Sequence, residues 1–403
     1  MGLFQDECKV VLQSLRGALT EALTSLGLDA SRPQQLAQRL GLHRKLCLKL
    51  AKIVTSADAF AAVPHVPGSA GVELLLTALA KAGVAPGIVQ RIRVAREDFD
   101  GLLQRHAGDR ITLDTVAGGF VPQAQRSEGL LQARREAFRG NSAILGVQAR
   151  VLMAVSIMAP SAEDPRRVDL GLLNGILDLR RLRPDVAWPL FRRKLWSADG
   201  VASEFKGRPL EPQSDAGGAP LLRAFCSPDL PEMDVRRSDD EVLYELPAGP
   251  VGRTAELTYV YGSYMPSVGT QYVDGDETLC EIGCNLETPV EVMHMDMLVH
   301  ESLTWAMRPR GDAFSLLGGR PVRGHRRHAS TRLMLERGVH ELGRGLDTMA
   351  TPHMPNYGAM LAYAFSCLGW DPSDFRGFRF TLPHPPIPAL ALMSMDLAQP
   401  PQG

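Results

Sequence analysis

The strongest constraint on the fold is a change in hydrophobic pattern near Trp196. Before it, apolar residues recur every three or four positions, as Leu15, Leu19 and Leu23 do, which is the period of an amphipathic α-helix. After a segment rich in Pro, Gly, Ser and Asp at 197–255, runs such as "LTYVYGSY" are rich in β-branched and aromatic residues with partial alternation, which is typical of strands. The sequence therefore predicts a multidomain chain with an all-α N-terminal half and a mixed α+β C-terminal half.

The same patterns predict individual elements and domain limits. Helices are expected over 4–26, 69–84, 87–108, 127–139, 142–158, 169–182, 330–347 and 357–368. Strands are expected over 253–264, 270–286 and 289–303, and the tail 375–397 is expected to form two strands separated by a proline break. These elements suggest an N-terminal helical unit over 1–60, a helical linker or core domain over 61–195 and an α+β domain over 196–403. The change between the two halves is expected between 185 and 245.

Length, charge and cysteine content narrow the setting. A chain of 403 residues is too long for one typical domain, and its 45% hydrophobic and 22% charged residues allow each part a core. The net charge of −1 produces no general attraction to nucleic acid or anionic membrane, so any electrostatic partner must be bound by a local patch. The six cysteines do not suggest a disulfide framework, and the start "MGLFQDECKVV" does not resemble a signal peptide. No window approaches the roughly 18 unbroken apolar residues of a membrane helix, so we expect a soluble cytoplasmic protein that does not bind membranes.

The segment "SRPQQLAQRLGLHRKLCLKLAKIV" at 31–54 predicts two short helices joined by a turn. Ser31 and Gln34 have the spacing of an N-terminal capping box, and Pro33 suits the first helical turn because its missing N–H costs little there. Gly41 can adopt the left-handed conformation that ends one helix before the next begins. The positions predicted to face inward and to be buried are Leu36, Ala37, Leu40, Leu42, Cys47 and Leu50.

This segment resembles the helix-turn-helix family of DNA-binding regulators over Pro33–Lys52. The resemblance rests on Ala37 at the tight helix crossing, Gly41 in the turn and apolar residues at the usual places. It implies that the second helix lies in a major groove of DNA. The DNA-contacting residues are then His43, Arg44, Lys45, Leu48 and Lys49 in the groove, with Lys52 at the phosphates.

Leu48 departs from the family pattern, because an apolar residue stands where a polar base-reading residue is usual. It either touches a thymine methyl group or packs in the core. No β-hairpin signal follows Ser56, so a wing is not predicted. The alternative to DNA binding is a structural helical hairpin whose basic side chains are only solvated.

Two further basic stretches lie outside this motif. The segment 177–196 interleaves six Arg and Lys residues with Trp188, Phe191 and Trp196, a mixture suited to phosphates or to stacked bases of a single strand. An amphipathic linker helix with its aromatic side chains on the core is the simpler prediction for it. The loop "GHRRHAS" at 324–330 suits a phosphate contact, although an exposed basic loop explains it as well.

Five residues that could bind a metal occur close together in the C-terminal half, namely Cys280, Cys284, His294, Asp296 and His300. Thiolates and imidazoles suit zinc, but C-x3-C followed after nine residues by H-x5-H is not a common zinc spacing. On an alternating strand, His294 and Asp296 would lie on one exposed side. The side chains facing the core would then be Met293, Met295 and Met297. We therefore predict a plain strand with exposed polar residues and no bound metal.

The sequence contains no Walker loop, dinucleotide fingerprint, G-x-S-x-G or HExxH motif, so neither an enzyme activity nor a cofactor is predicted. The patterns together favour a DNA-binding transcriptional regulator with a C-terminal effector- or protein-binding domain. Its expected partners are double-stranded DNA, a second copy of the chain in a homodimer, and a small-molecule or protein effector. The alternatives are an assembly or scaffold protein whose helical half makes protein–protein contacts, and a metal-dependent enzyme.

Overall fold

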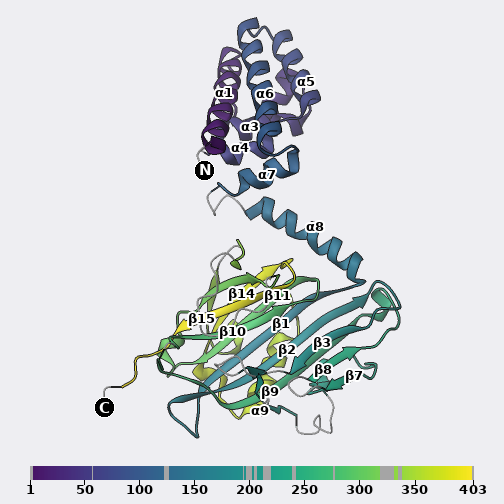
Figure 1. Cartoon of the computed structure of the whole chain (residues 1–403), viewed down its shortest axis with the longest axis vertical. Coiled ribbons are helices and arrows are strands. Elements are labelled where there is room, and N and C mark those ends of the chain that lie inside the picture. Colours follow the sequence, from purple (N-terminus) through teal and green to yellow (C-terminus); the bar gives the residue numbers. More distant parts are fainter. Residues whose placement is uncertain are drawn as a thin grey trace. The chain divides into compact units, whose positions relative to one another are not determined.

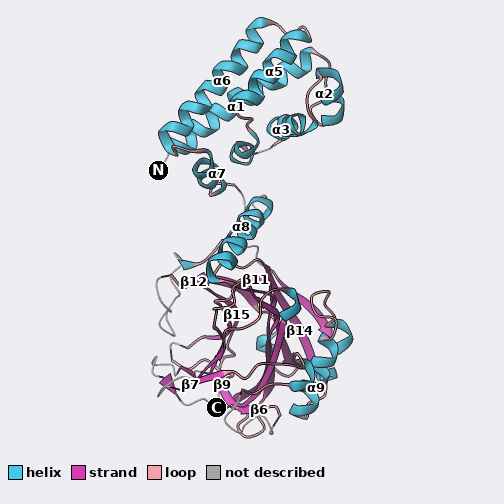
Figure 2. Cartoon of the chain, turned by 90° about the vertical axis from the view of Figure 1, so that its right-hand side faces the viewer, coloured by secondary structure: helices cyan, strands magenta, loops and turns pink. Residues whose placement is uncertain are grey.

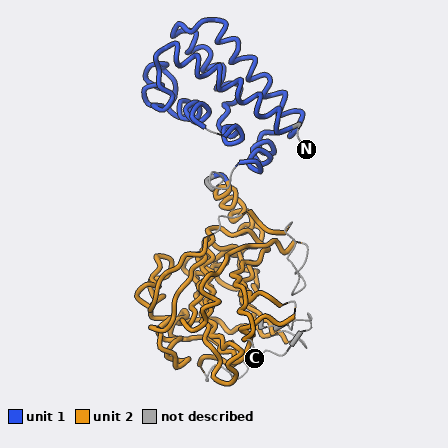
Figure 3. The backbone as a smooth tube through the Cα atoms, turned by 90° about the vertical axis from the view of Figure 1, so that its left-hand side faces the viewer, with its two compact units in different colours: residues 1–129 blue, residues 130–403 orange. Residues whose placement is uncertain are grey.

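The computed structural model describes residues 3–56, 58–121, 127–193, 195–196, 202–203, 207–211, 219–237, 242–275, 277–317, 331–334 and 338–401. The chain divides into two compact units, residues 1–129 and 130–403 (Figure 3). This division lies inside the segment 61–195 that the sequence pattern assigns to one helical domain, because strands begin already at Val147. The predicted fold class is confirmed: the elements within residues 4–145 are helices, and the C-terminal part is mixed α+β.

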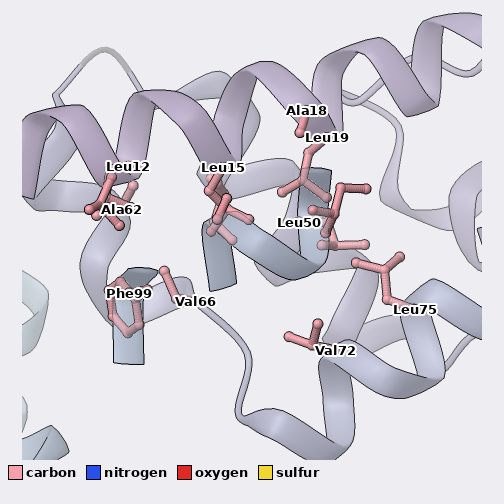
Figure 4. Close-up of a cluster of buried hydrophobic side chains, with 14 of the residues drawn as sticks. Leu12, Leu15, Ala18, Leu19, Leu50, Ala62, Val66, Val72, Leu75 and Phe99 are labelled. Atoms are coloured by element: carbon pink, nitrogen blue, oxygen red, sulfur yellow. The ribbon is translucent and has the colours of Figure 1, made fainter. Parts of the chain in front are cut away.

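The first unit is built from helices. They are α1 (Leu3–Ser25), α2 (Pro33–Leu40), α3 (Arg44–Thr55), α4 (Ala59–Ala62), the 3-10 helix η1 (Val63–His65), α5 (Ser69–Lys81), α6 (Pro86–His106) and α7 (Arg110–Gly118). The two longest, α1 and α6, pack side by side (Figure 2). Leu12, Leu15 and Leu19 of α1 form the centre of the core, together with Leu50 of α3 and Phe99 of α6 (Figure 4). The helices predicted over 4–26, 69–84 and 87–108 are confirmed by α1, α5 and α6.

Local sequence sets several ends of these helices. The Asp58 and Asp109 carboxylates accept hydrogen bonds from the backbone N–H groups of Ala61 at 3.1 Å and Thr112 at 3.0 Å, which begins α4 and α7. Among the described residues, no single helix is long and apolar enough to cross a membrane, although Ala59–His65 and Ser69–Lys81, with a 94° bend between them, meet that test of length and composition together.

The second unit begins within α8 (Ser127–Leu145) and contains a mixed seven-stranded sheet in the order β13-β14-β11-β1-β2-β9-β6 (Figure 1). Its strands are β1 (Val147–Pro160), β2 (Arg167–Arg181), β6 (Arg208–Pro209), β9 (Leu257–Thr270), β11 (Val290–His300), β13 (Val339–Arg344) and β14 (Phe375–Pro383). Strand β1 lies at the centre, antiparallel to β2 and parallel to β11. The remaining pairs in the large sheet are antiparallel.

Smaller sheets and helices complete this unit. The sheet β10-β15-β12 consists of β10 (Leu279–Leu286), β15 (Ala389–Asp396) and β12 (Arg310–Ser315). The sheet β3-β8-β7 consists of β3 (Trp188–Arg193), β8 (Val242–Leu246) and β7 (Asp234–Arg237), and β4 (Leu195–Trp196) pairs with β5 (Ala202–Ser203). Besides α8, the described helices are α9 (Tyr357–Leu368) and the 3-10 helices η4 (Arg223–Phe225), η5 (Arg253–Ala255), η6 (Thr304–Ala306), η8 (Leu346–Thr348) and η9 (Pro372–Asp374).

The large sheet is covered on both faces (Figure 2). On one face, Leu361 and Phe365 of α9 belong to the same core cluster as Val155 of β1. On the other, Met393 of the sheet β10-β15-β12 belongs to the same core cluster as Met295 of β11. The helix predicted at 357–368 and the strands predicted over 253–264, 270–286, 289–303 and 375–397 are confirmed by α9, β9, β10, β11, β14 and β15.

Three predicted helices are wrong. Most of 142–158 forms β1, 169–182 forms β2, and 339–344 within 330–347 forms β13. Strands β1 and β2 lie between two layers, and apolar residues therefore occupy successive positions over much of their length. Because successive positions are apolar, these strands lack the alternation of apolar and polar residues that identifies a strand with one solvated face. Apolar residues three and four positions apart then occur by coincidence and imitate a helix.

Candidate functional site

The break between α2 and α3 forms at Gly41, as predicted. Gly41 has a φ of +63°, in the left-handed region, and the next N–H, that of Leu42, donates to the Ala37 carbonyl at 3.2 Å. A Cβ added at Gly41 would meet nothing within 4 Å, so the backbone conformation alone favours glycine here.

The predicted capping box at the start of α2 is wrong. The N-cap is Arg32, which makes no side-chain cap, and Pro33 is the first helical residue. Ser31 therefore lies one residue too early for its hydroxyl to cap the first turn. Its own N–H donates instead to the Asp29 carboxylate at 2.8 Å, and hydrogen bonds with Ser31 lower the pKa of Asp29.

The start of α3 is capped by a residue that the family resemblance places in the groove. His43 is the N-cap, and its Nδ1 accepts a hydrogen bond from the Lys45 N–H at 3.2 Å. A ring nitrogen that accepts carries no proton, so the neutral ring holds its proton on Nε2. His43 is exposed, and it therefore presents an N–H donor at the N-terminus of α3.

The inner faces of α2 and α3 pack into the core of the helical unit. Of the six positions predicted to be buried, four are, namely Leu36, Leu40, Cys47 and Leu50. Ala37 and Leu42 are half-buried and pack against the same cluster. Arg16 of α1 donates from Nε to the Ile53 carbonyl at 3.1 Å, which ties α1 to the last turns of α3. Burial raises the pKa of the Cys47 thiol, which suits an unreactive core residue.

The outer face of α3 carries the other residues that the resemblance assigns to DNA. Two rows at helical spacing form this face, one with Arg44, Leu48 and Lys52 and one with Lys45 and Lys49. All five are exposed. Leu48 is 39% exposed, so of the two places predicted for its side chain the core is excluded.

The electrostatic environment of this face is uniform. Residues 30–56 include six cationic side chains and no acidic one, the cations being Arg32, Arg39, Arg44, Lys45, Lys49 and Lys52. Arg32 lies 3.5 Å from Asp29, whereas the four cations of α3 form no ion pair with any described residue. We call the side chains of Arg44, Lys45, Leu48, Lys49 and Lys52 the α3 face.

The described residues that follow α3 form α4, η1 and α5 rather than a β-hairpin. A wing is therefore absent from the described part of the helical unit, as expected. Leu46, on the side of α3 away from the α3 face, lies close to Gly71 at the start of α5.

The possible metal ligands of the second unit do not converge. Cys284 faces the core between β11 and the sheet β10-β15-β12, whereas His294 faces α9 on the opposite side of β11. His300 lies at the end of β11, where its Nδ1 is 2.8 Å from the Ser302 hydroxyl. Within the described residues, no three His, Cys, Asp or Glu side chains are placed to hold a metal ion together.

The predicted alternation of β11 is confirmed, but the predicted exposure of His294 and Asp296 is wrong. Both side chains are fully buried, because α9 and the segment before it cover this face. Asp296 accepts hydrogen bonds from Arg379 of β14, at 2.9 Å from Nε and 2.7 Å from Nη2, and from the Tyr357 hydroxyl at 2.6 Å. Arg379 also donates to the carbonyls of Met349 at 2.6 Å and Ala350 at 2.9 Å.

Charge balance in this buried network follows from its contacts. Burial acts to raise the pKa of Asp296, but hydrogen bonds from Arg379 and the nearby His294 and Arg379 charges outweigh it, so the pKa is lowered. His294 Nε2 lies 3.3 Å from Asp296, yet neither His294 ring nitrogen forms a hydrogen bond with a described residue. Burial, followed by the charges of His294, Arg150 and Arg379, lowers the pKa of His353. The network fastens the 349–357 segment to the sheet.

In the 177–196 stretch the arginines whose side chains are described are paired with acidic or carbonyl groups, and Arg183 and Arg192 are exposed beside Asp185 and Glu287. The helix predicted within 177–196 is wrong: Arg180 and Arg181 end β2, and Trp188 begins β3. Arg180 pairs with Glu256 at 3.0 Å, and Arg181 is buried with its guanidinium against the Pro247 and Pro250 carbonyls. The segment 324–330 lies outside the described residues.

Comparisons with known proteins add no family to these observations. No protein-family model matches the chain, and no curated protein shows significant similarity to it. Geometry and charge of the described residues are therefore the evidence for a function.

Proposed function

We propose that this protein binds double-stranded DNA through α2 and α3 and regulates transcription, with residues 130–403 binding a small-molecule or protein effector. The observation that carries the proposal is the α3 face, where four exposed cations lie on one helix without an acidic residue nearby in the sequence. A chain with a net charge of −1 has no general excess of positive charge, so this local concentration is a distinct feature.

The dimensions and residue types of α3 suit a major groove. Its 12 residues span about 18 Å, at about 1.5 Å per residue. A helix of about 10–12 Å diameter enters a groove about 12 Å wide. Arg44 and Lys45 in the first turn are suited to guanine edges, and Lys52 near the other end is suited to phosphate oxygens.

The test measures binding of the full chain to a random-sequence duplex by fluorescence anisotropy at several salt concentrations. The variant Arg44→Ala/Lys45→Ala/Lys49→Ala should bind more weakly and flatten the log–log salt slope, by about 0.9 for each phosphate that the variant no longer neutralises and by about 2.7 at most. The comparison variant is Lys81→Ala/Arg91→Ala/Arg105→Ala, which removes the same charge from exposed positions on α5 and α6, where Arg91 pairs with Glu21 and Arg105 with Glu7.

The two variants separate a specific face from a general charge effect. If the control weakens binding as much as the α3 variant does, net charge and not the α3 face governs binding. If the α3 variant binds duplex DNA like the parent, the basic side chains are only solvated and the proposal is overturned. A protein-binding scaffold would then be the better description of the helical unit.

A further inference from the structure

Leu48 is the one apolar residue of the α3 face, and its side chain cannot bind a phosphate group. Its side chain is 39% exposed, with Arg44 one turn before it and Lys52 one turn after it on the same side of the helix. Lys45 and Lys49 form the adjacent row. An apolar side chain therefore stands at the centre of a cationic surface.

Packing in the core of the helical unit does not explain why a leucine occurs at this position. The buried residues of α3 are Cys47, Leu50, Ala51 and Ile53; Leu50 and Ile53 lie on the side of the helix away from Leu48, and the small Ala51 lies beside it. Exposed leucines are common on protein surfaces and need no special cause in general. The position of Leu48 is informative because any base contacted by the middle of α3 would lie under this side chain.

The chemistry of the major groove limits what an aliphatic side chain can recognise there. Base edges present hydrogen-bond donors and acceptors, and the 5-methyl group of thymine is the apolar exception. We propose that Leu48 contacts the 5-methyl group of a thymine near the centre of the DNA site, which makes it a specificity-determining residue of α3. This inference rests on the proposed DNA binding.

The experiment removes the thymine methyl group and leaves the hydrogen-bonding edge of the base unchanged. The full chain is first used to select a preferred duplex from a random library, and each thymine of that duplex is then replaced singly by deoxyuridine, which keeps the hydrogen-bonding edge and lacks the methyl group. One replacement should weaken binding about fourfold, the factor expected for burying one methylene-sized group. With Leu48→Ala, thymine and deoxyuridine at that position should bind equally.

The matched control is Leu74→Ala, which shortens a leucine of α5 that is 63% exposed and leaves α3 intact. This variant should keep the fourfold preference. Leu48→Met, which retains an apolar tip, should keep a preference for thymine as well. Circular dichroism of each variant verifies that the helices are intact.

The outcomes separate this inference from the proposed function. Failure of the full chain to bind any duplex at low salt would overturn the proposed function. Binding without a selected sequence, or with no deoxyuridine position weaker than thymine, would overturn the role of Leu48 alone. A thymine preference that persists in Leu48→Ala would assign the methyl contact to another residue.

Discussion

Asp296 and Asp396 each form a two-point ion pair with an arginine, in surroundings that differ greatly. Asp296 is fully buried against Arg379, whereas the Asp396 side chain is 71% exposed beside Arg310. Arg310 donates to Asp396 at 2.7 and 2.9 Å, so the two pairs have nearly the same geometry. Exposed pairs contribute little because water screens the charges and the side chains lose rotational freedom. Removing one partner of a buried pair leaves an uncompensated charge.

Asp296→Asn should therefore lower the free energy of unfolding by about 3–5 kcal/mol at pH 7. Asp396→Asn should lower it by less than about 1 kcal/mol. Because the pKa of folded Asp296 is lowered, its stabilising effect is complete above the unfolded pKa of about 3.9 and is lost as the pH falls through the folded value. Urea unfolding at pH 7 and below pH 4 measures both effects. Equal losses from the two substitutions at pH 7 would contradict this account.

At the scale of elements, the parts of the fold that could be predicted are those whose sequence distinguishes two faces. Helix α3 was predictable because Cys47 and Leu50 face the core while Lys49 and Lys52 face water. Strand β1 has layers on both sides, so its sequence lacks the alternation that identifies a strand.

The candidate site divides in the same way. The residues of the α3 face all lie on one helix, so their helical spacing can be recognised in the sequence. The Asp296 network depends on the pairing of β11 with β14, which places Asp296 opposite Arg379. A signal was present, because Arg379 lies between the buried Phe378 and Phe380 on an alternating strand. The partner strand that would neutralise it could not be read from one sequence.

The joint between α2 and α3 permits a test of the backbone alone. Gly41→Ala should destabilise the helical unit by about 1–2 kcal/mol, because an L-residue is strained at a φ of +63°. Gly17→Ala is the matched control: Gly17 lies within α1, has open space at its Cβ, and should gain about 0.5–1 kcal/mol from alanine. Thermal unfolding followed by circular dichroism at 222 nm compares them. A neutral or stabilising Gly41→Ala would show that the turn does not require the left-handed conformation.

At the scale of the whole molecule, each unit has a core of its own. The core cluster of the helical unit consists of residues between Cys8 and Val121, and the buried clusters of the second unit begin at Val147. A unit with a complete core can fold independently. We therefore expect residues 1–129 to fold alone and to keep the α3 face.

A homodimer is proposed because two half-sites give an affinity that one helix does not reach, and the hypothesis to test is that its interface lies in residues 130–403. Light scattering should then give twice the mass of one chain for the full protein and the mass of a single copy for residues 1–129. The short chain should bind a single half-site and lose the gain from a second half-site placed one helical turn away. A monomeric full chain that binds two half-sites no better than one would contradict the dimer.

The parallel pairing of β1 with β11 has a consequence for synthesis of the chain on the ribosome. Strand β1 ends at Pro160, but its central neighbour β11 begins only at Val290. At about 5–20 residues per second, a strand that needs both neighbours waits on the order of ten seconds. The helices of residues 1–129 are complete before that interval begins. During it, the apolar surface of β1 and β2 that α9 and the sheet β10-β15-β12 later cover is open to chaperones or to other nascent chains, while the helical unit already has every residue of its core.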